Sequence, residues 1–151
     1  MHTPRHAATL VDLGGPLQTW VQHQHIPEGR VYAGASFRLH RGPDTLLYFD
    51  IALSSDTAER STPVGAAFIE GPPLLAAEVL EPWDTHGDIV ERAEACLANG
   101  VRLVWVIDPA VQTVTVYRPD AEPELFNVRQ ELTGEPHLPG FRVPARDIFG
   151  G

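Results

Sequence analysis

The 151-residue sequence contains no lysine, so all 11 of its basic residues are arginine. No reaction of this protein can therefore use a lysine ammonium, a lysine Schiff base or the phosphate-binding lysine of a P-loop. Its single cysteine excludes a disulfide framework and a zinc site built from several cysteines. Chemistry at a site of this protein must come from carboxylates, histidines, arginines and hydroxyl groups.

Long apolar runs are also absent. No segment approaches the roughly 20 apolar residues of a membrane-spanning helix, and no N-terminal segment has the apolar region of a signal peptide. We therefore expect a soluble, cytoplasmic protein without membrane association. The net charge of −9 argues against strong non-specific binding to nucleic acid, which requires a basic surface. An acidic nuclease that uses a metal ion remains compatible with this charge.

The chain length and the hydrophobic fraction of 43% predict one domain covering residues 1–151. Its organising segment has apolar runs over Leu74–Leu80 and Val101–Asp108, with a helical pattern between them that ends at Asn99 and Gly100. Short connections between these parts predict a βαβ unit with parallel strands. The expected fold class is α/β, with a mixed central sheet and flanking helices.

The other segments show turn residues and shorter periodic patterns. In chain order they predict a helix over 6–25 that is kinked or divided at Gly14–Pro16, a hairpin of 30–40 with 45–53, a loop over 54–73, a hairpin of 101–108 with 113–118, an edge strand over 124–129, a turn at 138–141 and a short helix over 145–149.

Two carboxylates interrupt otherwise apolar strands. Asp50 lies inside the second hairpin strand, and Glu78 lies in the middle of Leu74–Leu80. A buried carboxylate costs several kcal/mol unless it is paired or binds a metal. Two of them meeting at one end of a sheet would form an oxygen-rich site suited to Mg²⁺ or Mn²⁺. The alternative is that each carboxylate faces solvent or pairs with an arginine.

Several runs of residues follow one another in a characteristic order: Asp50–Leu53, Leu75–Asp84, Asn99–Pro109, Thr113–Arg118 and Leu138–Phe141. In this order they resemble the Uma-two family of restriction-endonuclease-like proteins. The resemblance covers nearly the whole chain. Its most specific parts are the Gly-Val-x-x-x-Trp-x-x-Asp-Pro run, which begins at Gly100, and the Leu-Pro-Gly-Phe run near the end.

The resemblance implies the PD-(D/E)xK nuclease fold and an endonuclease that cleaves DNA with Mg²⁺ (or Mn²⁺). By this resemblance Asp50 and Glu78 are the metal ligands. Arg92 occupies the position of a lysine on the following helix, so the implied catalytic residues are Asp50, Glu78 and Arg92. Asp88, one turn earlier, matches another recurrent acidic position. A homodimer is expected as well, because a single domain of this kind reaches only one DNA strand.

The sequence departs from the family pattern in four places. Phe49 replaces the usual proline, Glu81 a serine and Arg92 the lysine, while an N-terminal helix and hairpin that carry a further glutamate have no counterpart. Arginine keeps the positive charge but cannot act as a base, because it does not deprotonate. The alternative function is therefore a catalytically impaired family member that acts as a protein-interaction or assembly module.

The histidines suggest a zinc site less strongly than the carboxylates suggest magnesium. His23 and His25 are two residues apart, which places them on different faces of a helix. No second pair with ligand spacing was found among His6, His40 and His86, so no zinc site is expected. His86 lies at the expected start of the helix after Glu78, near the proposed metal. A role beside the metal or in substrate binding is one interpretation, and a solvated position at the helix start is the preferred one.

Overall fold

The structure is a computed structural model that describes residues 2–23, 29–40 and 42–151. Helices and strands are mixed along the chain. In the described residues they are α1 (Pro4–His23), β1 (Gly29–His40), β2 (Thr45–Ser55), α2 (Asp56–Arg60), β3 (Ile69–Glu70), β4 (Leu75–Val79), α3 (His86–Ala98), β5 (Leu103–Asp108), β6 (Thr113–Arg118), β7 (Ala121–Phe126), β8 (Glu131–Gly134), β9 (Leu138–Pro144) and α4 (Ala145–Ile148).

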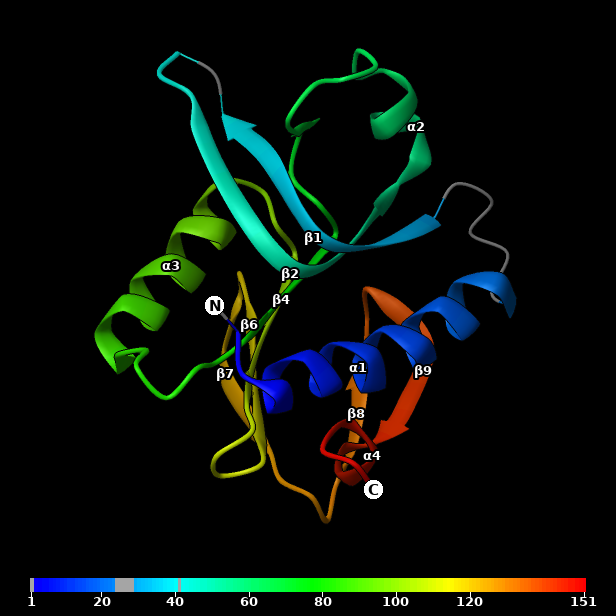
Figure 1. Cartoon of the computed structure of the whole chain (residues 1–151), viewed down its shortest axis with the longest axis vertical. Coiled ribbons are helices and arrows are strands. Elements are labelled where there is room, and N and C mark those ends of the chain that lie inside the picture. The colour runs from blue at the N-terminus through cyan, green and yellow to red at the C-terminus, as the bar shows by residue number, and fades with distance from the viewer. Residues whose placement is uncertain (1, 24–28, 41) are drawn as a thin grey trace.

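A seven-stranded mixed sheet forms the centre of the molecule, in the order β3-β1-β2-β4-β5-β6-β7 (Figure 1). Strands β4 and β5 are parallel and joined through α3, which confirms the predicted βαβ unit. The predicted hairpins β1–β2 and β5–β6 are antiparallel neighbours in this sheet. Strands β8 and β9 form a separate two-stranded sheet. The expected α/β class, with a mixed central sheet, is confirmed.

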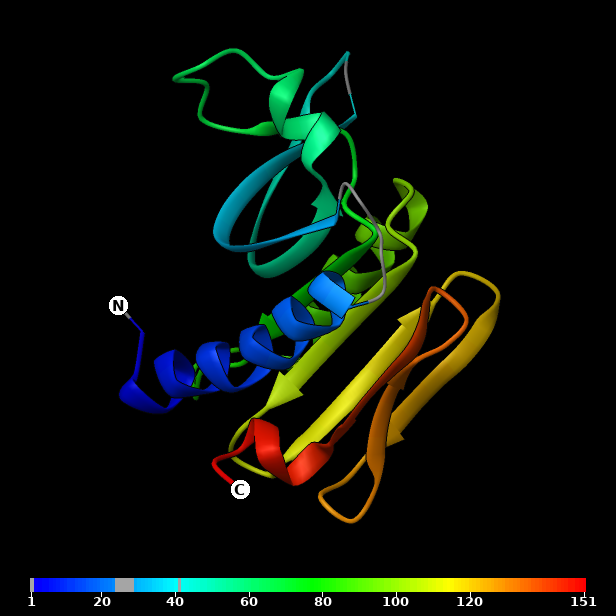
Figure 2. The same cartoon turned by 90° about the vertical axis from the view of Figure 1, so that its right-hand side faces the viewer.

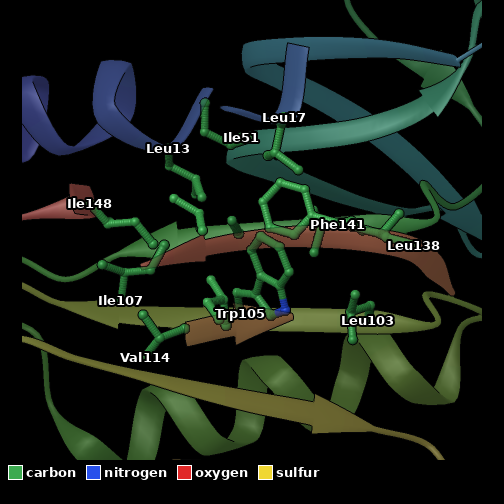
Figure 3. Packing of buried hydrophobic residues seen from close by; sticks show 14 of the residues in the cluster. Leu13, Leu17, Ile51, Leu103, Trp105, Ile107, Val114, Leu138, Phe141 and Ile148 are labelled. Carbon is green, nitrogen blue, oxygen red and sulfur yellow. The ribbon is translucent and has the colours of Figure 1, made fainter. Parts of the chain in front are cut away.

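Two hydrophobic cores lie on opposite faces of the sheet because strand residues alternate between faces. One core packs Leu13 and Leu17 of α1 against the sheet, α4 and the β8–β9 pair, around Trp105 and Phe141 (Figure 3). The other core packs Ala93 and Cys96 of α3 against the opposite face. Figure 2 shows the curved β1–β2 hairpin and α2 at one end of the molecule and α4 at the other. The sheet therefore separates α1 from α3.

The end of α3 follows the sequence signal at Asn99 and Gly100, and both ends are capped. Thr85 is the N-cap, and its hydroxyl accepts a hydrogen bond from the backbone N–H of Asp88. Asn99 is the C-cap, and Gly100 then adopts a φ of 97°, a backbone conformation that glycine tolerates best. These caps fix where α3 starts and therefore which of its residues face β4.

Three local predictions were wrong. Helix α1 is not divided and continues through Pro16, because buried residues on both sides of the proline, Leu13 and Leu17 among them, hold one packed face. Strand β7 covers 121–126 instead of 124–129, since it pairs with β6 directly after the turn. Residues 138–141 begin β9 and are not only a turn, because Leu138 and Phe141 enter the core while the strand pairs with β8.

Some details lie outside the predictions or outside the described residues. The loop expected over 54–73 contains α2 and the two-residue strand β3, which pairs with β1. The expected end of the first helix, at 26–29, falls largely among residues 24–28, which lie outside the described residues. No helix in the described part of the chain is both long and apolar enough to cross a membrane.

Candidate functional site

Strand pairing brings Asp50 and Glu78 to the same place. Ile51 of β2 pairs with Ala77 of β4, and continuing this antiparallel register by one residue sets Asp50 opposite Glu78. Ala52 and Ala76, two residues away on each strand, belong to the core on the α3 face. Because side chains two residues apart share a face, both carboxylates lie on the side of the sheet that α3 covers.

Asp50 is almost completely buried, with 4% of its surface exposed. Its Oδ2 accepts a hydrogen bond of 2.8 Å from the backbone N–H of Val79 and lies 3.2 Å from Nε2 of His6. These two contacts come from β4 and from the first turn of α1. They provide the hydrogen bonds that a buried carboxylate requires, and they fix its position within β2.

Helix α3 directs Arg92 to Glu78. The Nε and Nη2 atoms of Arg92 lie 3.0 and 2.8 Å from Oε1 of Glu78. Nη2 also donates to the backbone carbonyl of Tyr48, and the guanidinium carbon lies 5.8 Å from the centre of the Phe49 ring. Asp88 precedes Arg92 by one helical turn and lines the same pocket. The structure thus brings Asp50, Glu78 and Arg92 together.

Burial raises the pKa of Glu78 from 4.5 to about 8. Arg92 opposes this rise through its charge and its hydrogen bond, whereas Asp50 adds to it through its negative charge and a hydrogen bond between the two side chains. A carboxyl with this pKa is mostly protonated at neutral pH. A second cation beside the pair would favour the ionised form, as it does at carboxylate metal sites.

The two carboxylates face a pocket of about 620 Å³ between α3, β4 and the start of α1. Arg92 is the one arginine among the described residues that line it. The acidic residues that line it are Asp50, Glu78, Glu81, Asp84, Asp88 and Glu91. The pocket therefore has an excess of negative charge, and it attracts cations.

Sequence reasoning missed a second group at the pocket wall. Thr3 donates to Glu81 through its hydroxyl, at 2.9 Å, and through its backbone N–H, at 3.2 Å, while Nδ1 of His2 lies 2.9 Å from the same carboxylate. His6 contacts Asp50, as described above. The one signal in the sequence was the spacing of four between His2 and His6, and their partners are 44 to 79 residues away.

Comparison with known proteins assigns the chain to a family. A family described as "Putative restriction endonuclease", named Uma2, matches residues 1–146. The chain belongs to the Uma2 family. This confirms the resemblance found in the sequence and makes the chain a member of a restriction-endonuclease-like nuclease family. No curated protein matched the chain.

A solved structure shows the same fold as this Uma2 protein. It is a crystal structure from Anabaena variabilis ATCC 29413, described as that of "a putative nuclease". The two chains share 22% sequence identity with a TM-score of 0.81, over 99% of this chain and 83% of the other. At this identity the likeness concerns the fold, so the chemistry of the Uma2 protein has to be argued from its own residues.

Proposed function

We propose that this Uma2 protein is a divalent-metal-dependent endonuclease that hydrolyses phosphodiester bonds of DNA. The observation that supports this proposal best is the pairing of Asp50 and Glu78 on adjacent strands, with the pKa of Glu78 raised to about 8. A buried carboxyl whose pKa is raised in this way, beside a second carboxylate, is typical of a site that requires a cation. Families with restriction-endonuclease-like folds generally use divalent metals.

The residues of the pocket fit Mg²⁺ or Mn²⁺. Asp50 and Glu78 supply carboxylate oxygens, which both ions prefer, and the pocket has room for water molecules to complete the coordination. A bound ion would supply an activated water molecule and would stabilise negative charge on the phosphoryl group. Asp50 is already held by Val79 and His6, so its position needs no rearrangement to accept such an ion.

Arg92 is proposed to stabilise the phosphate. In the structure it contacts Glu78, and a metal ion at the carboxylate pair would replace it as the partner of that side chain. The guanidinium would stay near the pair through the Tyr48 carbonyl and the Phe49 ring, and its free N–H groups could then bind a phosphate oxygen. Because arginine does not deprotonate, Arg92 serves as a fixed positive charge and does not act as the base.

DNA and a second copy of the chain are the proposed partners. A pocket with six carboxylates and one arginine repels a phosphate backbone until cations reduce its negative charge. We therefore expect DNA binding at this site to depend on divalent metal more steeply than in a basic nuclease. A homodimer would bring two such sites to the two strands of a duplex.

The decisive experiment combines metal binding with cleavage. Mn²⁺ or Mg²⁺ should raise the melting temperature in a concentration-dependent manner, and plasmid DNA should be nicked only when metal is present. Asp50→Asn should abolish both effects. Glu122→Gln removes one exposed carboxylate of β7, outside the pocket, and is the matched control that should keep both.

The result also separates the two functions left open by the sequence. A metal-dependent rise in melting temperature without cleavage would favour the impaired family member that acts as an interaction module. Absence of both, in wild type and in Arg92→Lys, would refute the nuclease proposal.

A further inference from the structure

A second cluster of potential metal ligands lies on the wall of the pocket, beside the Asp50–Glu78 pair. One nitrogen of His2, one nitrogen of His6 and one carboxylate oxygen of Glu81 lie within 4.8 Å of one another. The two imidazole rings are stacked, with their centres 3.9 Å apart and their planes 3° from parallel. The cluster connects the residues at the start of α1 with the loop that follows β4.

His6 has one ring nitrogen without a partner. The side chain is 1% exposed, and its Nε2 faces Oδ2 of Asp50 at 3.2 Å. A carboxylate only accepts hydrogen bonds, so Nε2 is the ring nitrogen that donates to Asp50. Nδ1, the other ring nitrogen, is buried and has no hydrogen-bond partner among the described residues. A buried ring nitrogen without a partner requires an explanation.

The surroundings of His6 match those of a metal-binding histidine. Such histidines generally donate their other ring N–H to a carboxylate, which fixes the tautomer and orients the ring. Asp50 has that relation to Nε2 of His6, so Nδ1 is the nitrogen left for an ion. We propose that His2, His6 and Glu81 form a site for a divalent transition-metal ion of the Zn²⁺ class, separate from the proposed Mg²⁺ site.

The donor set determines the class of ion. Two imidazole nitrogens and one carboxylate oxygen suit Zn²⁺ and its neighbours, whereas Mg²⁺ prefers oxygen ligands alone. Three protein ligands leave a coordination position open, and all three residues line the pocket. Water or a substrate oxygen would occupy that position.

The site needs a small movement to close on an ion. Bonds of about 2.0–2.1 Å at tetrahedral angles place ligand atoms about 3.3 Å apart. In the structure the three ligand atoms lie within 4.8 Å of one another, so they have to move closer together. Two stacked rings also cannot both direct a lone pair at one ion. His2 can make this adjustment, because its side chain is 51% exposed and precedes α1, whereas His6 and Glu81 are buried.

Glu81 is held in place to act as a ligand. Its carboxylate accepts hydrogen bonds from the hydroxyl and the backbone N–H of Thr3, at 2.9 and 3.2 Å. Nδ1 of His2 lies 2.9 Å from the same carboxylate. Glu81 occupies the position where serine is usual in the resemblance described above, so this ligand distinguishes the chain from the usual pattern.

The test uses the full chain freed of metal with a chelator. Zn²⁺ is titrated while the melting temperature is followed, and Co²⁺ is titrated while its visible absorption is recorded as a probe of nitrogen ligation. Wild type should respond in both assays. His2→Ala, which changes an exposed side chain, should weaken the affinity for Zn²⁺ by at least about tenfold, since even changes behind a ligand cost about 10–100-fold. Glu81→Gln should do the same.

Two further variants make the outcome specific. His23→Ala removes an exposed histidine at the other end of α1 and should leave the response to Zn²⁺ unchanged. Glu78→Gln should lose the response to Mg²⁺ and Mn²⁺ but keep the Zn²⁺ response, while His2→Ala should show the reverse pattern. The zinc proposal can therefore fail while the nuclease proposal stands, and the nuclease proposal can fail alone.

The proposal would be overturned by any of three results. These are a wild type without visible Co²⁺ absorption, a His2→Ala variant with wild-type affinity for Zn²⁺, or an equal loss of affinity in His23→Ala. Should Glu81→Gln fail to fold because its carboxylate is buried, the comparison of His2→Ala with His23→Ala still decides the question.

Discussion

Glu78→Gln should remove much of the dependence of stability on pH between about pH 5 and pH 8. The pKa of Glu78 is about 8 in the folded protein and 4.5 ordinarily, so over this interval the folded state holds a proton that the unfolded state has released. The stabilisation is complete below pH 4.5, and it is lost as pH rises through about 8. Glutamine keeps the size of the side chain but cannot ionise.

The size of the change in unfolding free energy follows from the interval between the two pKa values of Glu78. At about 1.4 kcal/mol per pH unit, the free energy of unfolding falls by at most about 5 kcal/mol between these two pKa values. The Glu78 side chain is 20% exposed, so solvent reduces the cost of its charge. We expect roughly 2–5 kcal/mol, with the variant more stable relative to wild type at pH 8 than at pH 5.

Urea unfolding of both proteins in chelator, at intervals from pH 4.5 to pH 9, measures this difference directly. Other titrating groups are common to the two proteins and cancel in the comparison. Adding Mg²⁺ at pH 8 should recover stability in wild type and not in Glu78→Gln, because the ion favours the ionised carboxylate. If the free energy of unfolding changed with pH in the same way in both proteins, Glu78 would not be held in its protonated form.

Three other predictions concern single positions. Arg92→Ala should lower metal-dependent DNA cleavage by about 10²–10³-fold. Arg92→Lys should retain cleavage, because the proposed role requires only a fixed positive charge. A wild type that is inactive, together with an Arg92→Lys variant that cleaves DNA, would contradict that role. Leu17→Ala should cost about 2–5 kcal/mol of unfolding free energy because Leu17 is fully buried, whereas Val11→Ala, on the exposed side of α1, should change stability by less than about 0.5 kcal/mol. Gly134→Ala should destabilise the protein by about 1–3 kcal/mol in thermal or urea unfolding, because its new Cβ would lie 2.6 Å from Cβ of Leu138; wild-type stability would refute this steric argument.

The regular part of the fold could be predicted because its signals are local. The βαβ unit combines apolar strands, a helical period between them and a stop at Asn99 and Gly100, so period and end agree. The placement of Arg92 followed from the family resemblance and from helical spacing. The wrong break in α1 arose because Pro16 was judged by its local cost, whereas buried leucines on either side stabilise one continuous helix.

The cluster at the start of α1 could not be predicted because its contacts are distant in sequence. His6 meets Asp50 across 44 residues and Thr3 meets Glu81 across 78, and neither pair has a spacing that a helix or a strand would reveal. The expectation of no zinc site rested on spacings among His6, His23, His25, His40 and His86, and His2 was not among them. Strands β8 and β9 were missed for a similar reason, since the pairing of Leu132 with Val143 depends on tertiary contacts.

One edge of the central sheet restricts how this protein can assemble. Strand β7 carries Pro123 between two exposed glutamates, and proline has no N–H to donate to an added strand. At the other edge, among the described residues, β3 pairs only with Phe37 and Arg38, so the rest of β1 also borders that edge. Copies of the chain that associate should therefore not join strand to strand through β7, which keeps that edge from becoming a template for aggregation.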